Sequence, residues 1–280
     1  MKYLLIKLLF FPSLLFAQAS IKGVIINEAK EPLPLTNIVL VNKSAGTITD
    51  DQGRFVLENI TETDSVKITN IAYKSIIVAI KNLYQNDTIL LFRSEIALDE
   101  VIVGDLSKYR QEQLLGFSNY PDKGSFSLQP GNQIALYIAN EKGITGHIKG
   151  ISFQLKETGK CKNSMRLRLL RLDTLTSLPA KDILIENILL QSSDLKKANY
   201  IDVSKYNILL PYEGVVVLLE WVFPDNLCNK NAYSSVSANL LVPNNLVWMN
   251  YRDGAWKKNN RPRLPNGNFM TPNIGIKVAY

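Results

Sequence analysis

The segment from residue 21 to residue 55 constrains the fold of this chain more than any other. It opens with the apolar run Ile21–Ile26, passes through a proline turn at Glu31–Pro34, and reaches a glycine-closed turn at Asp50–Gly53 before the next apolar run. Strands separated by such short turns predict a compact antiparallel β-sandwich. In the second turn we expect aspartate to cap backbone amides and Gly53 to take a positive φ.

An alternation of apolar and polar residues continues beyond this segment. Phe55 and Leu57 fall on one side of a strand, and Val66 and Ile68 repeat the pattern. A period of two is that of a β-strand with one buried face, and no helical period competes with it. Residues 20–103 are therefore predicted to form one all-β unit.

This unit resembles the carboxypeptidase-regulatory-like, transthyretin-like β-sandwich domain found at the N-terminus of many Gram-negative envelope proteins. The resemblance rests on Gly23-Val24, Pro32-Leu33-Pro34 leading into Asn37-Ile38-Val39-Leu40, Gly46-Thr47-Ile48-Thr49-Asp50 with Gly53 and Phe55, and Leu98-Asp99-Glu100-Val101-Ile102-Val103. Ala72-Tyr73 departs from the family, which usually has Gly-Tyr at that place. The resemblance implies a stable docking or spacer module whose strand edges can pair with partners.

The resemblance does not imply peptidase activity. A zinc carboxypeptidase holds its metal with two histidines and a carboxylate, whereas this chain has one histidine, His147. His147 is not accompanied by a serine or cysteine in a nucleophile motif. We therefore expect no metal, no cofactor and no catalytic residue.

The first 19 residues have the pattern of a secretory signal peptide. Lys2 precedes the apolar run Leu8–Phe16, and Ala17-Gln18-Ala19 is a small-residue cleavage site. No later run approaches the roughly 20 apolar residues of a transmembrane helix, so we expect no membrane span. The pattern predicts export, and the resemblance implies that the exported protein is periplasmic or associated with the cell surface or outer membrane.

The basic residues of the chain are interleaved with acidic ones. The 32 lysines and arginines stand against 25 acids, and the net charge of +7 would fall to +5 on loss of Lys2 and Lys7. In one of the densest basic groups, Arg166, Arg168 and Arg171 are separated by leucines. This spacing predicts a strand with a solvated basic face, so we expect no nucleic-acid partner.

A polar segment at residues 104–123 is predicted to be a linker, with room for a short helix at Leu106–Leu115. Beyond it, residues 124–280 contain short strands joined by Gly, Pro, Asn and Asp, which predict a second antiparallel sandwich of jelly-roll type. Val215–Leu219 has the composition of a central buried strand. The expected strands cover residues 147–155, 165–172, 183–190, 200–203, 214–222, 246–251 and 274–279.

The two cysteines, Cys161 and Cys228, have polar, loop-like neighbours. In a chain that is predicted to be exported, this setting favours a single disulfide between them. A metal site would need further cysteines or histidines nearby, and the sequence has none there.

Among the acids of the second unit, Glu220 is notable because it lies in a hydrophobic run beside Trp221. Glu186 and Glu213 could join it only through the fold, as the acid and base of a glycan hydrolase. We expect instead that Glu220 lies at the outer edge of a sheet.

Aromatic residues near the predicted strand ends give the most specific hypothesis about a ligand. Their rings can stack on the apolar faces of sugars while neighbouring polar groups bind the hydroxyls. The predicted ligand-binding residues are Trp248, Asn250, Tyr251, Arg252, Asp253 and Trp256. The competing interpretation buries Trp221 and Trp248 in the core and leaves only Trp256 exposed on a hairpin.

The sequence thus predicts an all-β chain of two sandwiches, exported and non-enzymatic, with carbohydrate or an envelope protein as its partner. Two alternatives stay open, a glycan-acting hydrolase and a purely structural assembly factor. A hydrolase predicts a deep cleft with two converging acids, and a binding module predicts a shallow aromatic platform. An assembly factor predicts an apolar patch without a pocket.

Overall fold

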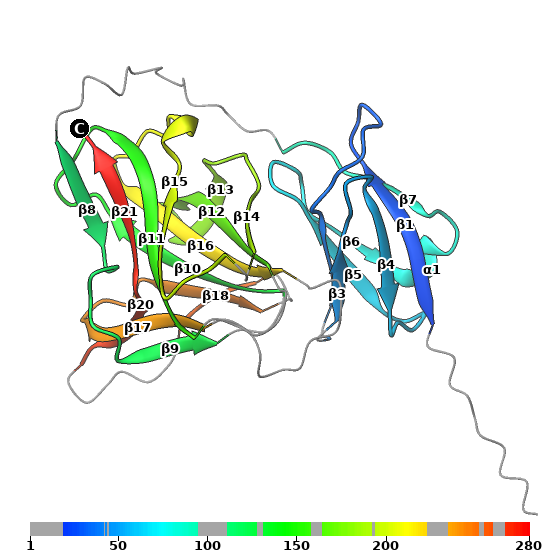
Figure 1. Cartoon of the computed structure of the whole chain (residues 1–280). Helices are drawn as coiled ribbons and strands as arrows, with labels where there is room; N and C mark the ends of the chain where they lie inside the picture. Colours follow the sequence, from blue (N-terminus) through cyan, green and yellow to red (C-terminus); the bar gives the residue numbers. More distant parts are fainter. Residues whose placement is uncertain are drawn as a thin grey trace, which may run out of the picture.

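A computed structural model describes residues 19–41, 43, 45–94, 111–127, 131–157, 164–191, 194–222, 235–251, 255–259 and 267–280. The predicted signal peptide up to residue 18 and the predicted disulfide between Cys161 and Cys228 lie outside these residues. The described chain is nearly all β, as expected, and forms two units side by side (Figure 1). In the described part, no helix is both long and apolar enough to cross a membrane.

The N-terminal module consists of two small sheets, with strand orders β4-β1-β7 and β3-β2-β5-β6. Its elements are β1 (Ser20–Ile26), β2 (Asn37–Leu40), β3 (Gly46–Ile48), β4 (Arg54–Glu58), β5 (Ser65–Thr69), β6 (Ile76–Ala79), α1 (Ile80–Leu83) and β7 (Thr88–Leu90). The two-residue period explains the core, since Phe55 and Leu57 of β4 are buried while Val56 between them is exposed. The expected closing strand at residues 98–103 lies outside the described residues.

The turn before β4 has the expected chemistry. The Oδ1 atom of Asp50 accepts hydrogen bonds from the backbone amides of Gln52 (2.9 Å) and Arg54 (2.8 Å). Gly53 has a φ of 70°, and a Cβ there would lie 2.5 Å from the carbonyl oxygen of Ile25. Only glycine meets both conditions without strain, which confirms the prediction for this turn.

The C-terminal unit is larger and contains two seven-stranded sheets. One sheet has the strand order β13-β12-β16-β10-β18-β19, and β14 also pairs with β12. The other sheet has the strand order β20-β17-β11-β21-β8, in which β15 also pairs with β11 and β9 with β17. The strands are β8 (Glu112–Gly116), β9 (Gly124–Ser127), β10 (Asn132–Ala139), β11 (His147–Glu157), β12 (Ser164–Asp173), β13 (Leu178–Asp182), β14 (Ile188–Gln191), β15 (Ala198–Asp202), β16 (Gly214–Val222), β17 (Ser235–Val242), β18 (Val247–Tyr251), β19 (Trp256–Lys258), β20 (Phe269–Pro272) and β21 (Ile274–Ala279). The main core lies between the two sheets and includes Val217 of β16 and Ile276 of β21.

Strand β16 is central, as its composition predicted. It pairs with β10 on one side and β12 on the other, and all nine of its residues are buried. Val217 and Trp221 point into the core between the sheets, whereas Val216 and Leu218 belong to a second cluster with Trp248. The sheet therefore buries side chains on both faces.

Strand β8 corrects the prediction of a linker and a short helix. It lies inside residues 104–123 and pairs antiparallel with β21, with Leu115 opposite Ile276. Leu115 packs against the core while Leu114 is 36% exposed. One apolar side chain on the inner face gives too weak a pattern to reveal a strand, and the pairing with β21 determines its structure.

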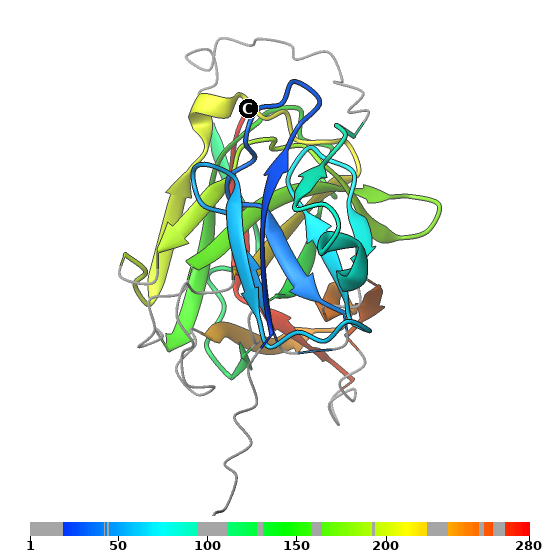
Figure 2. The ribbon, with the colours of Figure 1, turned by 90° about the vertical axis from the view of Figure 1, so that its right-hand side faces the viewer.

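The N-terminal module turns its sheet β3-β2-β5-β6 toward the C-terminal unit, and the sheet β4-β1-β7 lies on the far side (Figure 1). Figure 2 looks onto this module with the C-terminal unit behind it. The two units meet at the outer face of the sheet that contains β16, because Asn37 of β2 hydrogen-bonds Glu220 of β16.

Candidate functional site

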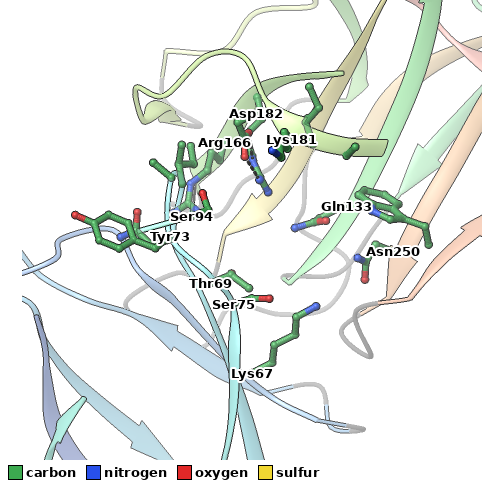
Figure 3. A pocket seen from close by; sticks show the side chains of 17 residues that line it. Lys67, Thr69, Tyr73, Ser75, Ser94, Gln133, Arg166, Lys181, Asp182 and Asn250 are labelled. Atoms are coloured by element: carbon green, nitrogen blue, oxygen red, sulfur yellow. Dashed lines mark hydrogen bonds and ion pairs between the residues drawn. The ribbon is translucent and has the colours of Figure 1, made fainter. Parts of the chain in front are cut away.

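A pocket of about 390 Å³ lies where the two units meet (Figure 3). The N-terminal module contributes residues of β5 and of the turn after it, among them Lys67, Tyr73 and Ser75. The C-terminal unit contributes the outer face of one sheet, including Gln133 of β10 and Asn250 of β18. The volume falls in the range of small-molecule sites, about 300–1,000 Å³.

Beside this pocket, a buried ion pair of the C-terminal unit hydrogen-bonds to the N-terminal module. The Nη1 atom of Arg166 lies 3.2 Å from Oε2 of Glu220, and each residue is 1% exposed. Oε1 of Glu220 accepts hydrogen bonds from Asn37 Nδ2 (2.9 Å) and Gln133 Nε2 (3.1 Å). Arg166 also donates through Nη2 to the carbonyl oxygen of Leu35 in the N-terminal module.

The arginines of β12 do not form the solvated face that their spacing predicted. Arg166 is buried because the N-terminal module covers this end of the sheet, and burial lowers its pKa while Glu220 opposes the shift. Arg168 binds Asp182 through two hydrogen bonds, Nε to Oδ1 at 2.8 Å and Nη2 to Oδ2 at 2.6 Å. Burial favours a lower pKa for Arg168 as well, but the carboxylate of Asp182 raises it above its ordinary value. Arg171, farther along the strand, pairs with Glu213 at 3.0 Å.

Glu220 is not at the edge of a sheet, which corrects the expectation for this acid. Its strand has neighbours on both sides, and its side chain lies in the interface between the units. Glu213 directly precedes the same strand and lies seven residues before Glu220, so an extended chain separates the two backbones by roughly 23 Å. A glycosidase pair needs about 5–10 Å, so Glu213 and Glu220 do not form one.

The three tryptophans considered for the ligand site have different environments in the structure. Trp221 is fully buried in the main core, and Trp248 is 4% exposed in the cluster on the outer face of its sheet. Trp256 is half-buried and lines the pocket. Lys258 Nζ lies 5.4 Å from the centre of the Trp248 ring.

Two of the six predicted ligand-binding residues, Asn250 and Trp256, line the pocket. Trp248 packs in the neighbouring cluster, and Tyr251 is 41% exposed and does not line the pocket. Arg252 and Asp253 lie outside the described residues. His147 is buried at the start of β11, in the other sheet, and does not line the pocket either.

The N-terminal half of the pocket was not predicted. Tyr73 follows Ala72, which has a φ of 67°, and the carbonyl of Ala72 accepts a hydrogen bond from the Ser94 amide (2.9 Å). The guanidinium of Arg93 lies 5.9 Å from the centre of the Tyr73 ring. The departure from Gly-Tyr to Ala-Tyr was a usable signal, because it marked a turn in which an alanine adopts a left-handed conformation.

The lining of the pocket suits a polar ligand with an apolar face. Trp256 supplies a ring, and Gln133 and Asn250 supply amides that can donate and accept, whereas the ring of Tyr73 packs against the core of its own module. Within the described residues, no group of three or more His, Cys, Asp or Glu side chains could hold a metal ion. The site is therefore suited to binding by stacking and hydrogen bonds.

Comparison with known families agrees with the resemblance of the N-terminal module. Residues 21–103 match the family model described as CarboxypepD_reg-like domain. A search of curated proteins found no match to the chain. The match covers one of the two units that build the pocket.

Proposed function

We propose that this chain, whose N-terminal module is a CarboxypepD_reg-like domain, is an exported envelope protein that binds a saccharide between its two units. The observation that carries the proposal is the pocket at their interface, with the half-buried ring of Trp256 beside the amides of Gln133 and Asn250. Aromatic rings stack on the C–H faces of sugars, and amides hydrogen-bond the hydroxyls.

The pairing of the acidic residues with arginines supports a binding role rather than hydrolysis. Asp182 is the one carboxylate among the described residues that line the pocket, and it forms two hydrogen bonds with Arg168. Glu220 is held by Arg166 behind the lining. Hydrolysis of a glycoside requires one acid to give up a proton and a second to act as base or nucleophile. Carboxylates committed to arginines are poor choices for either role.

The N-terminal sequence and the two cysteines support export. A cleavable signal at residues 1–19 would deliver the chain to an oxidising compartment in which Cys161 and Cys228 can pair. Thiol titration of the exported, denatured protein tests this part of the proposal. We expect no reactive thiol, and two free thiols would contradict the disulfide.

A glycan-array screen of the full chain tests the binding function. We expect one class of saccharide to bind, and we expect Trp256→Ala to weaken its binding about tenfold because a stacking ring is lost. Tyr212→Ala is the matched control, since Tyr212 is 84% exposed and does not line the pocket. It should leave binding unchanged, and circular dichroism should show that both variants fold.

Two outcomes would contradict the proposal. One is the absence of binding to any saccharide, which would favour an envelope protein as the partner and direct the next experiment to pull-downs from envelope extracts. The other is binding that Trp256→Ala leaves intact, which would place the saccharide outside the pocket.

A further inference from the structure

A row of polar side chains crosses the outer face of the sheet that lines the pocket. Glu220 of β16 is paired in register with Gln133 of β10, and Gln133 is paired in turn with Asn250 of β18. Asn250 is opposite Trp256 of β19. Residues directly opposite one another on antiparallel strands point to the same face, so these side chains follow one another across the sheet. Gln133 and Asn250 lie next to each other in the pocket (Figure 3), and Glu220 is at the buried end of the row.

The side-chain amide of Gln133 is held in one orientation. Its Nε2 atom donates a hydrogen bond to Oε1 of Glu220 at 3.1 Å. Glu220 is a carboxylate paired with Arg166, and a carboxylate can accept hydrogen bonds but cannot donate them. The NH2 group of Gln133 must therefore face Glu220, because the reversed amide would bring two acceptor oxygens together.

The carbonyl oxygen of the same amide is left for a ligand. Oε1 of Gln133 has no hydrogen-bond partner among the described residues, and it is not closed off from solvent. It belongs to a side chain that lines the pocket, so a ligand there can reach it. Gln133 therefore presents a fixed acceptor to the cavity. Asn250 differs, because its side-chain amide has no hydrogen bond within the described part of the chain and can turn either way.

Glu220 is fixed in turn by both units. Nη1 of Arg166 donates to its Oε2 atom at 3.2 Å, and Nδ2 of Asn37 in the N-terminal module donates to its Oε1 atom at 2.9 Å. Together with Gln133, three donors determine the position of a carboxylate that is 1% exposed. Glu220 does not itself line the pocket, so we expect it to affect a ligand through Gln133.

We infer that Gln133 accepts a hydrogen bond from a free hydroxyl group of the saccharide, and that Glu220 is the positioning residue that gives Gln133 this role. The inference rests on the proposed saccharide-binding function and adds the chemical group that the pocket recognises. A hydroxyl group can donate to the fixed oxygen, whereas a methyl ether at the same position has no proton to donate and leaves that oxygen unpaired. Saccharides that are substituted at this hydroxyl should therefore bind weakly.

Methyl ethers of simple sugars test the inference. A glycan array carries the pyranosides of glucose, galactose, mannose and N-acetylglucosamine, each beside its mono-O-methyl ethers, and is probed with the full chain. We expect at least one parent sugar to bind about tenfold more tightly than one of its ethers, because the ether loses the hydrogen bond to Gln133. We call this ratio the hydroxyl preference.

Two variants assign the hydroxyl preference to its residues. Gln133→Met removes the acceptor at a similar side-chain length, so the parent sugar should bind about tenfold more weakly, as its ether does. In Glu220→Gln the new amide can donate, which lets Gln133 turn its NH2 group toward the cavity, and the preference should fall to about threefold or less. Glu213→Gln is the matched control, since Glu213 pairs with Arg171 away from the pocket, and it should keep the preference. Loss of folded protein weakens parent and ether alike, so the ratio separates positioning from a structural role.

A measurement on the unaltered protein does not depend on the folding of any variant. NMR hydrogen exchange compares the side-chain amide of Gln133 with that of Gln85, which is exposed and has no side-chain hydrogen bond among the described residues. We expect slower exchange at Gln133, because its NH2 group donates to Glu220. Equal exchange at the two amides would overturn the positioning role of Glu220.

The failures are distinguishable. If sugars bind but no hydroxyl preference exists, or if the preference survives Gln133→Met, the inference is wrong while the saccharide-binding function stands. If a folded Glu220→Gln variant keeps the full preference, Glu220 is not the positioning residue. If no parent sugar on this array binds, the inference is overturned, and the broader saccharide screen decides separately whether the binding function stands.

Discussion

Replacement of Glu220 by alanine should strongly destabilise the protein. The carboxylate is 1% exposed and accepts hydrogen bonds from Arg166, Asn37 and Gln133. Its loss leaves the guanidinium of Arg166 buried without a counter-charge. Removal of one partner from a buried ion pair costs about 3–5 kcal/mol.

The geometry supports a magnitude in this range. At 3.2 Å, and with an effective dielectric constant of about 20, the attraction between the two charges amounts to roughly 5 kcal/mol before any relaxation. Two further hydrogen bonds of about 1 kcal/mol each are lost with Glu220. Water entering the vacated space recovers part of the total, so we expect a net loss of about 3–5 kcal/mol.

Unfolding in guanidinium chloride measures this loss. All three tryptophans, Trp221, Trp248 and Trp256, lie in the C-terminal unit, so their fluorescence reports its unfolding, while circular dichroism follows both units. Separate transitions by the two methods would require each unit to be analysed by itself. Glu213→Ala is the control, because its ion pair with Arg171 is partly exposed and should contribute at most about 1 kcal/mol.

A double-mutant cycle with Arg166→Met separates the pair from its surroundings. The double variant should lose at least about 2 kcal/mol less than the sum of the single variants, because it leaves no unpaired charge in the interface. A loss below about 1 kcal/mol for Glu220→Ala, or an additive cycle, would refute the conclusion that the ion pair is buried between the docked units.

Two further predictions concern the N-terminal module. Ala72→Gly should raise the free energy of unfolding by about 0.5–1 kcal/mol, because relief of the strain at the positive φ of 67° outweighs the added entropy of the unfolded chain. A lower free energy of unfolding in denaturant would contradict the strain at Ala72. Burial alone would raise the pKa of Asp64, but hydrogen bonds from Lys43 and Thr61 lower the pKa below 3.8. The contribution of Asp64 to stability is therefore complete above about pH 4 and is lost as the pH falls toward the pKa of the folded state. Asp64→Asn should therefore destabilise the module at neutral pH and flatten the dependence of its melting temperature on pH below 4, and an unchanged acid limb would show that the carboxylate has no such role.

The sequence predicts those features that depend on neighbouring residues. The alternation at Phe55 and Leu57 and the Asp50–Gly53 turn are local, so the N-terminal module follows from them. Strand β16 could also be anticipated, because a strand buried on both faces has a continuous apolar run. Weakly patterned strands such as β8 were missed, since only their pairing identifies them.

The candidate site was predicted only in part because it depends on the docking of two units. The alternation of arginine and leucine in β12 correctly indicates a strand, but nothing local shows that another module covers Arg166. Glu220 is the complementary signal, a lone acid in an apolar strand paired with β12 in register with Arg166. Asn250 and Trp256 were identified from the aromatic pattern of their own unit, whereas Tyr73 and Lys67 come from the other.

Strand β21 has a consequence for the order in which the protein assembles. It lies between β11 and β8 in its sheet, so that sheet cannot close until Ile274–Ala279 has been synthesised. The N-terminal module is complete long before then and presents Asn37, whose partner Glu220 follows 183 residues later. A module that folds early can make this contact only after the later unit has folded, and contacts between residues so far apart in the sequence form slowly. The sheet that lines the pocket packs on this last sheet through the main core, so we expect ligand binding to report completed assembly.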